Sequence, residues 1–182
     1  MPAYFLVVFA VLSRIALAMS PHPEWFNFTA VGGALLYFGA RRGWREMVGP
    51  LVALMTTDYL LTTVVYAYPF RWQMYVTTWL WYAMAMMLGW VLLRARTTVV
   101  RVAAGALLGP TSFFLVSNYA VWASGTMYPP TWSGLMTCLA AGLPFYRNDL
   151  FATALVAGAA FGIPVLVARL RQPQVVPAVV RK

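Results

Sequence analysis

Two ionisable residues, Arg14 and Asp58, interrupt long apolar stretches of this 182-residue chain. A charge at the centre of a bilayer costs about 2.5 to 3.5 kcal/mol on insertion scales, so such residues usually face a protein interior. Each residue lies eleven positions after the first residue of its stretch (3–19 and 47–68), which is about 16 Å of helix. Equal depth predicts an intramembrane ion pair. It could link two helices structurally, or it could contact a ligand or an ion.

A second group of residues combines amide, hydroxyl and aromatic side chains, as a small-molecule pocket does. They lie in the segments 20–28, 112–122 and 128–149, which we expect to meet at one end of the molecule. The candidate ligand-binding residues are Asn27, Asn118, Trp122, Tyr128 and Arg147. Each has an alternative role: the aromatic residues could form an interfacial belt, the amides could cap or join helices, and Arg147 could bind a lipid phosphate.

Other chemistry has few residues to support it. The single histidine, His22, lies between two prolines and is interpreted as an exposed loop residue. The single cysteine, Cys138, is interpreted as a small buried hydrophobic residue, with a thiolate metal ligand as the alternative. No phosphate-binding glycine loop, zinc-protease motif, serine triad or glycosidase carboxylate pair is present, so we expect neither an enzyme nor a bound metal or cofactor.

The elements that must position these residues are membrane helices. The chain is 62% hydrophobic and 9% charged, whereas soluble domains are about half apolar and about a quarter charged. About 20 mostly apolar residues cross the hydrocarbon core, and six windows predict such helices: 3–19, 27–40, 47–68, 74–93, 102–122 and 150–170. The apolar piece 132–143 is too short to span and predicts a re-entrant or interfacial helix.

The predicted fold class is therefore all-α, a polytopic membrane protein with a bundle of six transmembrane helices plus that short helix. Residues 1–171 form a single transmembrane domain, and 172–182 form a loose basic tail. Small residues at a spacing of four occur in four of the helices and predict close packing within the chain, with a docking face for a partner as the alternative. They are Ala30 and Ala34, Ala85 and Gly89, Gly105 and Gly109, and Ala154, Gly158 and Gly162.

The basic residues predict the orientation. With the N-terminus in the cytoplasm, ten of the thirteen Lys and Arg residues fall at cytoplasmic helix ends, as the positive-inside rule requires. These ten are Arg41, Arg42, Arg45, Arg94, Arg96, Arg101, Arg169, Arg171, Arg181 and Lys182. The net charge of +9 therefore reflects membrane topology, and no nucleic-acid partner is expected. Both termini are expected in the cytoplasm.

The motifs of the chain resemble those of a bacterial family of small integral membrane proteins that is known as a domain of unknown function. The shared features are a membrane Arg, Pro-x-Pro, Asn-Phe-Thr, an Asp in the third helix, Phe-Phe with Ser-Asn and Trp, Tyr-Pro-x-Thr, Gly-Leu, Cys and Pro-Phe. They are matched by Arg14, Pro21, Pro23, Asn27, Phe28, Thr29, Asp58, Phe113, Phe114, Ser117, Asn118, Trp122, Tyr128, Pro129, Thr131, Gly134, Leu135, Cys138, Pro144, Phe145 and Asn148. This resemblance implies a location in the bacterial inner membrane.

In length and six-helix layout, such proteins are similar to the substrate-binding S components of energy-coupling-factor vitamin transporters. That similarity implies capture of a vitamin-like small molecule through an outward-facing pocket, with the lipid bilayer and a separate energising module as partners. The alternative is a noncatalytic structural or accessory subunit of a larger membrane complex, such as a photosynthetic or respiratory one.

Overall fold

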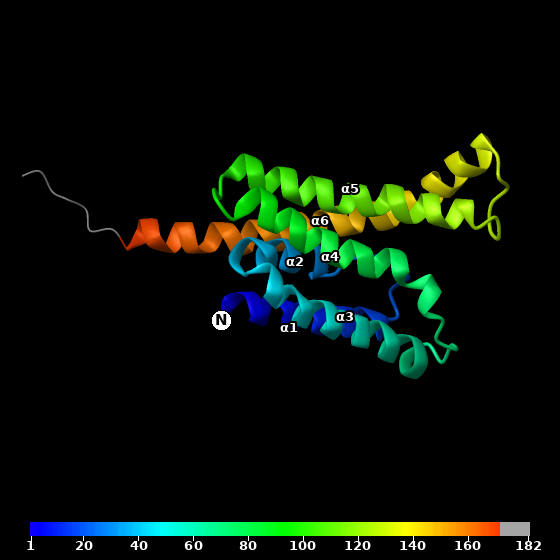
Figure 1. The fold of residues 1–182 in the computed structure, drawn as a ribbon, viewed down its shortest axis with the longest axis horizontal. Helices are drawn as coiled ribbons and strands as arrows, with labels where there is room; N and C mark the ends of the chain where they lie inside the picture. Colours follow the sequence, from blue (N-terminus) through cyan, green and yellow to red (C-terminus); the bar gives the residue numbers. More distant parts are fainter. Residues whose placement is uncertain (172–182) are drawn as a thin grey trace, which may run out of the picture.

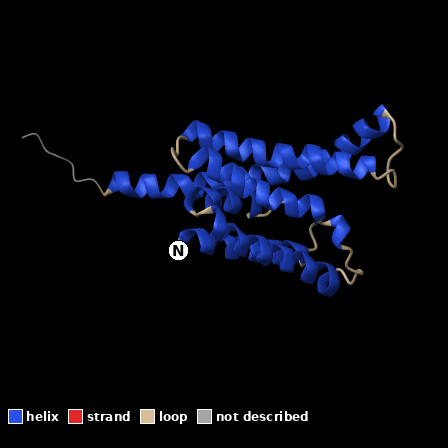
Figure 2. Ribbon diagram, viewed as in Figure 1, coloured by secondary structure: helices blue, strands red, loops and turns tan. Residues whose placement is uncertain are grey.

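The computed structural model describes residues 1–171, and this part of the chain is helical without a strand (Figures 1 and 2). The predicted all-α fold with six principal helices is confirmed. These helices are α1 (Pro2–Ala18), α2 (Val31–Arg41), α3 (Val48–Leu60), α4 (Val76–Leu93), α5 (Val99–Ala123) and α6 (Trp132–Leu170). The predicted tail, 172–182, lies outside the described residues.

Four shorter helical turns complete the elements. Three are 3₁₀ turns, η1 (Pro23–Trp25), η2 (Trp44–Met47) and η4 (Trp72–Met74), and one is a π-helical segment, η3 (Leu61–Val65). Because η2, α3 and η3 follow one another without a break, residues Trp44–Val65 form a helical stretch of 22 residues.

Four helical stretches are long and apolar enough to cross a membrane: Trp44–Val65, α4, α5 and α6. The helix α1 is apolar but shorter, with 17 residues. The helix α2 has 11 residues, which is about 16 Å and about half of the hydrocarbon thickness. The apolar window that predicts this helix, 27–40, is short as well.

The helix α2 forms the centre of the bundle. Every residue from Val31 to Ala40 is buried, and α2 packs against α1, α4, α5 and α6. Its central position explains why a helix of three turns can be apolar on all sides, since its neighbours rather than lipid surround it. The loop 19–30, which contains η1, leads into α2 and lies at the end of the bundle where α1 finishes (Figure 1).

Glycines let α2 and α4 approach closely. A Cβ atom on Gly39 would overlap the carbonyl oxygen of Met86, and a Cβ atom on Gly89 would overlap that of Leu36. The predicted packing role therefore holds for Gly89. The predicted packing role does not hold for three other small residues of this pattern, because a Cβ atom on Gly109, Gly158 or Gly162 would meet no atom within 4 Å.

The predicted separate short helix at 132–143 is wrong, because these residues form the first part of α6. Thr131 caps this helix by accepting a hydrogen bond from the Gly134 N–H at 3.1 Å, and α6 then continues for 39 residues, about 58 Å. Pro144 lies inside the helix, where it removes one backbone hydrogen bond without ending the helix. The polar stretch 147–149 does not end it either, because Asp149 is buried against the bundle.

Most arginines lie at one end of the bundle, shared by the N-terminus of α1 and the C-terminus of α6 (Figure 1). The loop between α2 and α3 and the loop between α4 and α5 are at this end. Its basic residues within 1–171 are Arg41, Arg42, Arg45, Arg94, Arg96, Arg101, Arg169 and Arg171. The loops 19–30, 66–75 and 124–131 lie at the opposite end, which we call the loop end.

Candidate functional site

Arg14 on α1 and Asp58 on α3 lie in contact inside the bundle. The Nη2 atom of Arg14 is 2.6 Å from Oδ1 of Asp58, and the side chains are 20% and 1% exposed, respectively. The structure thus contains the ion pair that the equal depth of these two residues predicts. A buried ion pair of this kind needs further hydrogen bonds to offset the loss of water from both charges.

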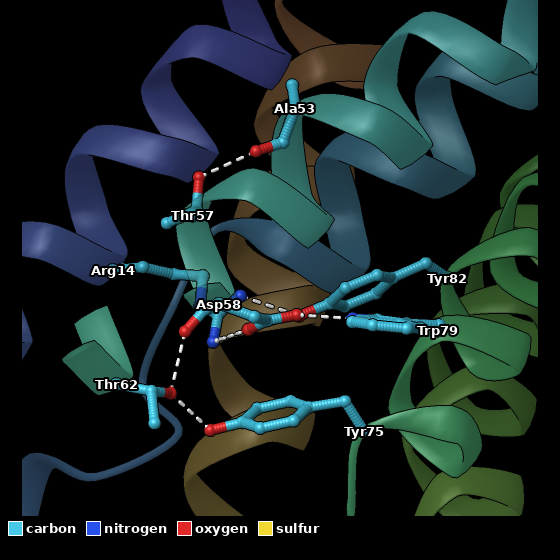
Figure 3. Close-up of polar contacts among 8 residues, drawn as sticks. All are labelled: Arg14, Ala53, Thr57, Asp58, Thr62, Tyr75, Trp79 and Tyr82. Atoms are coloured by element: carbon cyan, nitrogen blue, oxygen red, sulfur yellow. Dashed lines mark hydrogen bonds and ion pairs between the residues drawn. The ribbon is translucent and has the colours of Figure 1, made fainter. Parts of the chain in front are cut away.

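Helix α4 supplies those hydrogen bonds (Figure 3). Trp79 donates its indole N–H to Oδ2 of Asp58 at 3.0 Å. The hydroxyl of Tyr82 accepts a hydrogen bond from Nη1 of Arg14 at 2.6 Å and donates to Oδ1 of Asp58 at 3.4 Å. Both carboxylate oxygens of Asp58 are therefore satisfied, and the cluster joins α1, α3 and α4.

The helix changes its pitch three residues after Asp58. The π-helical segment η3 starts at Leu61, and Tyr66 donates its backbone N–H to the carbonyl of Leu61 at 2.9 Å. Within η3, Thr62 donates its hydroxyl to the carbonyl of Asp58 at 2.7 Å and also pairs with the hydroxyl of Tyr75 (Figure 3). Single π turns are common at functional positions in helices, and this one orders polar groups next to the ion pair.

Two adjoining cavities lie between this cluster and the loop end. The first, which we call the Arg14 cavity, has a volume of about 220 Å³ and is lined by Arg14, Asp58 and Tyr82 among others. The second, the Asn118 cavity, has a volume of about 320 Å³ and lies between α5 and the first half of α6. Asn27, Phe113 and Asp149 line both cavities and form the wall that they share.

Three of the five predicted ligand-binding residues line the Asn118 cavity: Asn27, Asn118 and Tyr128. Cys138 lines it too, and its thiol is within 3.4 Å of the Asn118 carbonyl oxygen and 3.6 Å of the Asn118 Oδ1 atom. The Asn118 amide donates to the carbonyl of Phe114 at 2.7 Å, one turn earlier on α5. Four further aromatic side chains line it as well: Phe113, Phe114, Phe145 and Tyr146.

Asn27 has a backbone conformation that few residues adopt. Its φ angle is +63°, in the left-handed region, where asparagine is tolerated better than most residues with a Cβ. The loop before α2 turns at this residue. Asn27 therefore has a structural role in addition to its place in the shared wall.

The other two predicted residues lie outside both cavities. Trp122 donates its indole N–H to the carbonyls of Pro129 at 3.0 Å and Thr131 at 3.2 Å, so it fastens the loop between α5 and α6. Arg147 is exposed on α6 and forms no side-chain hydrogen bond or ion pair within residues 1–171. His22 is exposed and contacts Glu24 at 2.9 Å.

Two residues that were not among the predicted ligand-binding residues have clear positions at the site. Asn148 donates its amide to the carbonyls of Glu24 at 2.7 Å and Phe26 at 2.9 Å, and so holds the loop 19–30 against α6. Asp149 is 6% exposed and lines both cavities. A helical spacing of four, through Asp149, Thr153, Ala157 and Phe161, was the signal that could have placed it on the buried face.

The cavities are lined by groups that could bind a small molecule. Among residues 1–171, no three His, Cys, Asp or Glu side chains gather as a metal site requires. The lining of the cavities combines aromatic surface with a few oriented amides, hydroxyls and carboxylates, which is the chemistry of small-molecule recognition.

The fold and this site define an all-helical, multi-pass membrane protein with a buried ion pair and two cavities toward one end of its bundle. The chain belongs to a family described as "Family of unknown function (DUF6580)", whose model matches residues 1–176. No curated protein and no solved structure matches it.

Proposed function

We propose that this protein binds a small organic molecule in the Asn118 cavity and transports it across the bacterial inner membrane. The observation that carries the proposal is the cavity itself. Its volume of about 320 Å³ falls within the range of small-molecule sites, and Asn27, Asn118 and Tyr128 supply orienting polar groups in a wall that also carries several aromatic rings.

The proposed direction of capture rests on the distribution of charge. Arginines gather at the end of the bundle opposite the loop end, and the positive-inside rule assigns an arginine-rich end to the cytoplasm. The loop end, with the cavity beside it, then faces the exterior. Both termini are cytoplasmic in this orientation.

The proposed role is noncatalytic and similar to that of the S components of energy-coupling-factor transporters. An S component captures its compound from outside and receives energy from a separate module. The aromatic and amide lining of the Asn118 cavity suits a vitamin-like compound with both apolar surface and hydrogen-bonding groups.

The proposal is tested by purifying the full chain in a maltoside detergent and identifying retained small molecules by mass spectrometry. A retained compound, added back, should raise the melting temperature of the wild type because it binds the folded state alone. Asn118→Ala should abolish this increase while the protein stays folded. The matched control is Gln73→Ala, which removes an exposed amide outside both cavities. An undiminished increase in Asn118→Ala would exclude Asn118 from the binding site.

A second candidate function is that of an accessory subunit in a larger membrane complex. The observation in its favour is an open apolar groove of about 530 Å³ between α5 and α6, lined by Ala154, Gly158 and Gly162. Small residues at such spacing let a neighbouring helix approach closely. An accessory subunit should leave native membranes in mild detergent only together with its partners, whereas a binder should be monodisperse alone.

A further inference from the structure

Asp149 is a buried carboxylate in the wall between the two cavities. It lies on α6, its side chain is 6% exposed, and it lines the Asn118 cavity and the Arg14 cavity alike. A molecule in either cavity would therefore meet this carboxylate. Asp149 takes no part in the ion pair between Arg14 and Asp58.

The hydrogen bonding of Asp149 differs sharply from that of Asp58. Asp58 has a guanidinium at 2.6 Å and an indole donor at 3.0 Å. Asp149 has a single donor, the hydroxyl of Thr153, at 3.3 Å from Oδ1. No Lys, Arg or His within residues 1–171 lies within ion-pair distance of it. An ionised carboxylate buried without a cationic partner is costly, so a cation bound beside Asp149 would offset that cost.

The remaining lining of the cavities favours a positive group. The ionisable Asp and Arg side chains that line them are Arg14, Asp58 and Asp149, and since the first two pair with each other, the carboxyl group of Asp149 is the one left to pair with a ligand. Aromatic rings line part of the same space, including the Phe113 ring in the shared wall. Aromatic faces attract organic cations through their quadrupoles, and an aromatic wall with a carboxylate is a common way to recognise an ammonium group.

We propose that the small molecule bound by this protein carries an organic ammonium group, and that Asp149 binds this group at the wall between the two cavities. The inference rests on the proposed binding function and specifies the class of ligand. The carboxylate supplies the charge partner, and the aromatic rings replace the water around the cation.

The experiment uses two probes of nearly equal shape. Choline carries a trimethylammonium group, and 3,3-dimethylbutan-1-ol has a neutral tert-butyl group in its place. Each is added to the full chain in a maltoside detergent, with sodium chloride matching the ionic strength. For the wild type, we expect choline to raise the melting temperature by about 2 °C or more and the neutral alcohol to raise it less. We also expect Asp149→Asn to bind choline at least about tenfold more weakly, as the loss of a charged partner implies.

Three controls make the result specific. Asp149→Asn without a probe should melt no lower than the wild type, because a buried carboxyl group without a cationic partner has been replaced by a neutral amide of the same shape; a carboxyl group with a structural role would give a lower melting temperature. Thr153→Val keeps the carboxylate and should keep the preference for choline. Glu24→Gln removes an exposed acidic group near the loop end and should also keep it.

The outcomes separate this inference from the proposed function. Choline and the neutral alcohol could stabilise the wild type equally, and Asn118→Ala could abolish the stabilisation by each probe. This outcome would overturn the ammonium inference and leave small-molecule binding intact. Stabilisation by neither probe, together with no retained compound in the purified protein, would overturn both. The comparison of the two probes on the wild type needs no variant, so it decides even where Asp149→Asn does not fold.

Discussion

Arg14 on α1 and Asp58 on α3 form a 2.6 Å ion pair, and the hydroxyl of Tyr82 on α4 binds both partners. One tyrosine thus connects a cation and an anion from two other helices. Because Trp79 on α4 also donates to Asp58, the cluster fixes three helices relative to one another. The cost of removing either charge should therefore exceed that of a surface ion pair.

The first prediction concerns this pair. Arg14→Ala and Asp58→Ala each leave one buried charge unpaired, and each should destabilise the fold by about 3 to 5 kcal/mol. The double variant should recover part of the loss, although the donors on Tyr82 and Trp79 then lack an acceptor. Folded yield and melting temperature, measured by fluorescence-detected size-exclusion chromatography after heating, check this. A double variant no better than the worse single variant would contradict the pairing.

The second prediction concerns the contact between α2 and α4. Gly39→Ala and Gly89→Ala each place a methyl group against a backbone carbonyl of the other helix, which cannot move away as a flexible side chain can. We expect each to cost at least about 1 to 3 kcal/mol, as overpacking does. The matched control is Gly49→Ala on α3, where a Cβ meets no atom within 4 Å. Similar melting temperatures for all three variants would show that the two helices do not pack this closely.

The sequence was sufficient for features that depend on local composition and helix pitch. Apolar windows identified the helices, and 1.5 Å per residue put Arg14 and Asp58 at one depth. The sequence could not identify the hydrogen-bond partners of Asp58 on α4. Trp79 and Tyr82 are three residues apart on α4, a spacing that predicts a shared face but does not say which helix that face meets.

The first half of α6 shows why the rest could not be predicted. A hydropathy window ends where polar residues begin, so Asn148 and Asp149 separated the apolar piece 132–143 from the last span. In the structure these two residues are helical. Asn148 donates to the carbonyl of Glu24 in the loop 19–30, and Asp149 lies on the buried face of α6. A hydropathy window measures neither the contact with the distant loop nor the burial of this face.

The third prediction concerns Asn148. Its amide donates to two carbonyls of the loop 19–30, and Asn148→Ala leaves both without this donor. We expect hydrogen exchange in peptides covering 20–30 to become faster, with a loss of about 1 to 3 kcal/mol in local opening free energy. Exchange in peptides covering 124–131 should not change, because Trp122 holds that loop. Unchanged exchange in 20–30 would show that other contacts hold the loop.

The fourth prediction separates the two roles of Asn27. Asn27→Gly keeps the left-handed backbone and removes the amide from the cavity wall, whereas Asn27→Ala removes the amide and strains the backbone by about 1 to 2 kcal/mol. We expect the glycine variant to melt close to the wild type and the alanine variant to melt lower, while both bind the retained compound more weakly. Full binding by Asn27→Gly would limit Asn27 to a backbone role. Ala67→Gly, at a φ angle of +53°, is the control and should raise the melting temperature.

The fifth prediction concerns sidedness. In a Cys138→Ala background, Thr126→Cys at the loop end and Arg96→Cys at the arginine-rich end each provide one exposed thiol. A membrane-impermeant maleimide added to intact cells should label position 126, and it should reach position 96 only after the cells are permeabilised. The physical reason is that arginine-rich loops are retained on the cytoplasmic side during insertion. Labelling of position 96 alone would place the loop end and the Asn118 cavity on the cytoplasmic side, and a protein so oriented could not capture a compound from outside through that cavity.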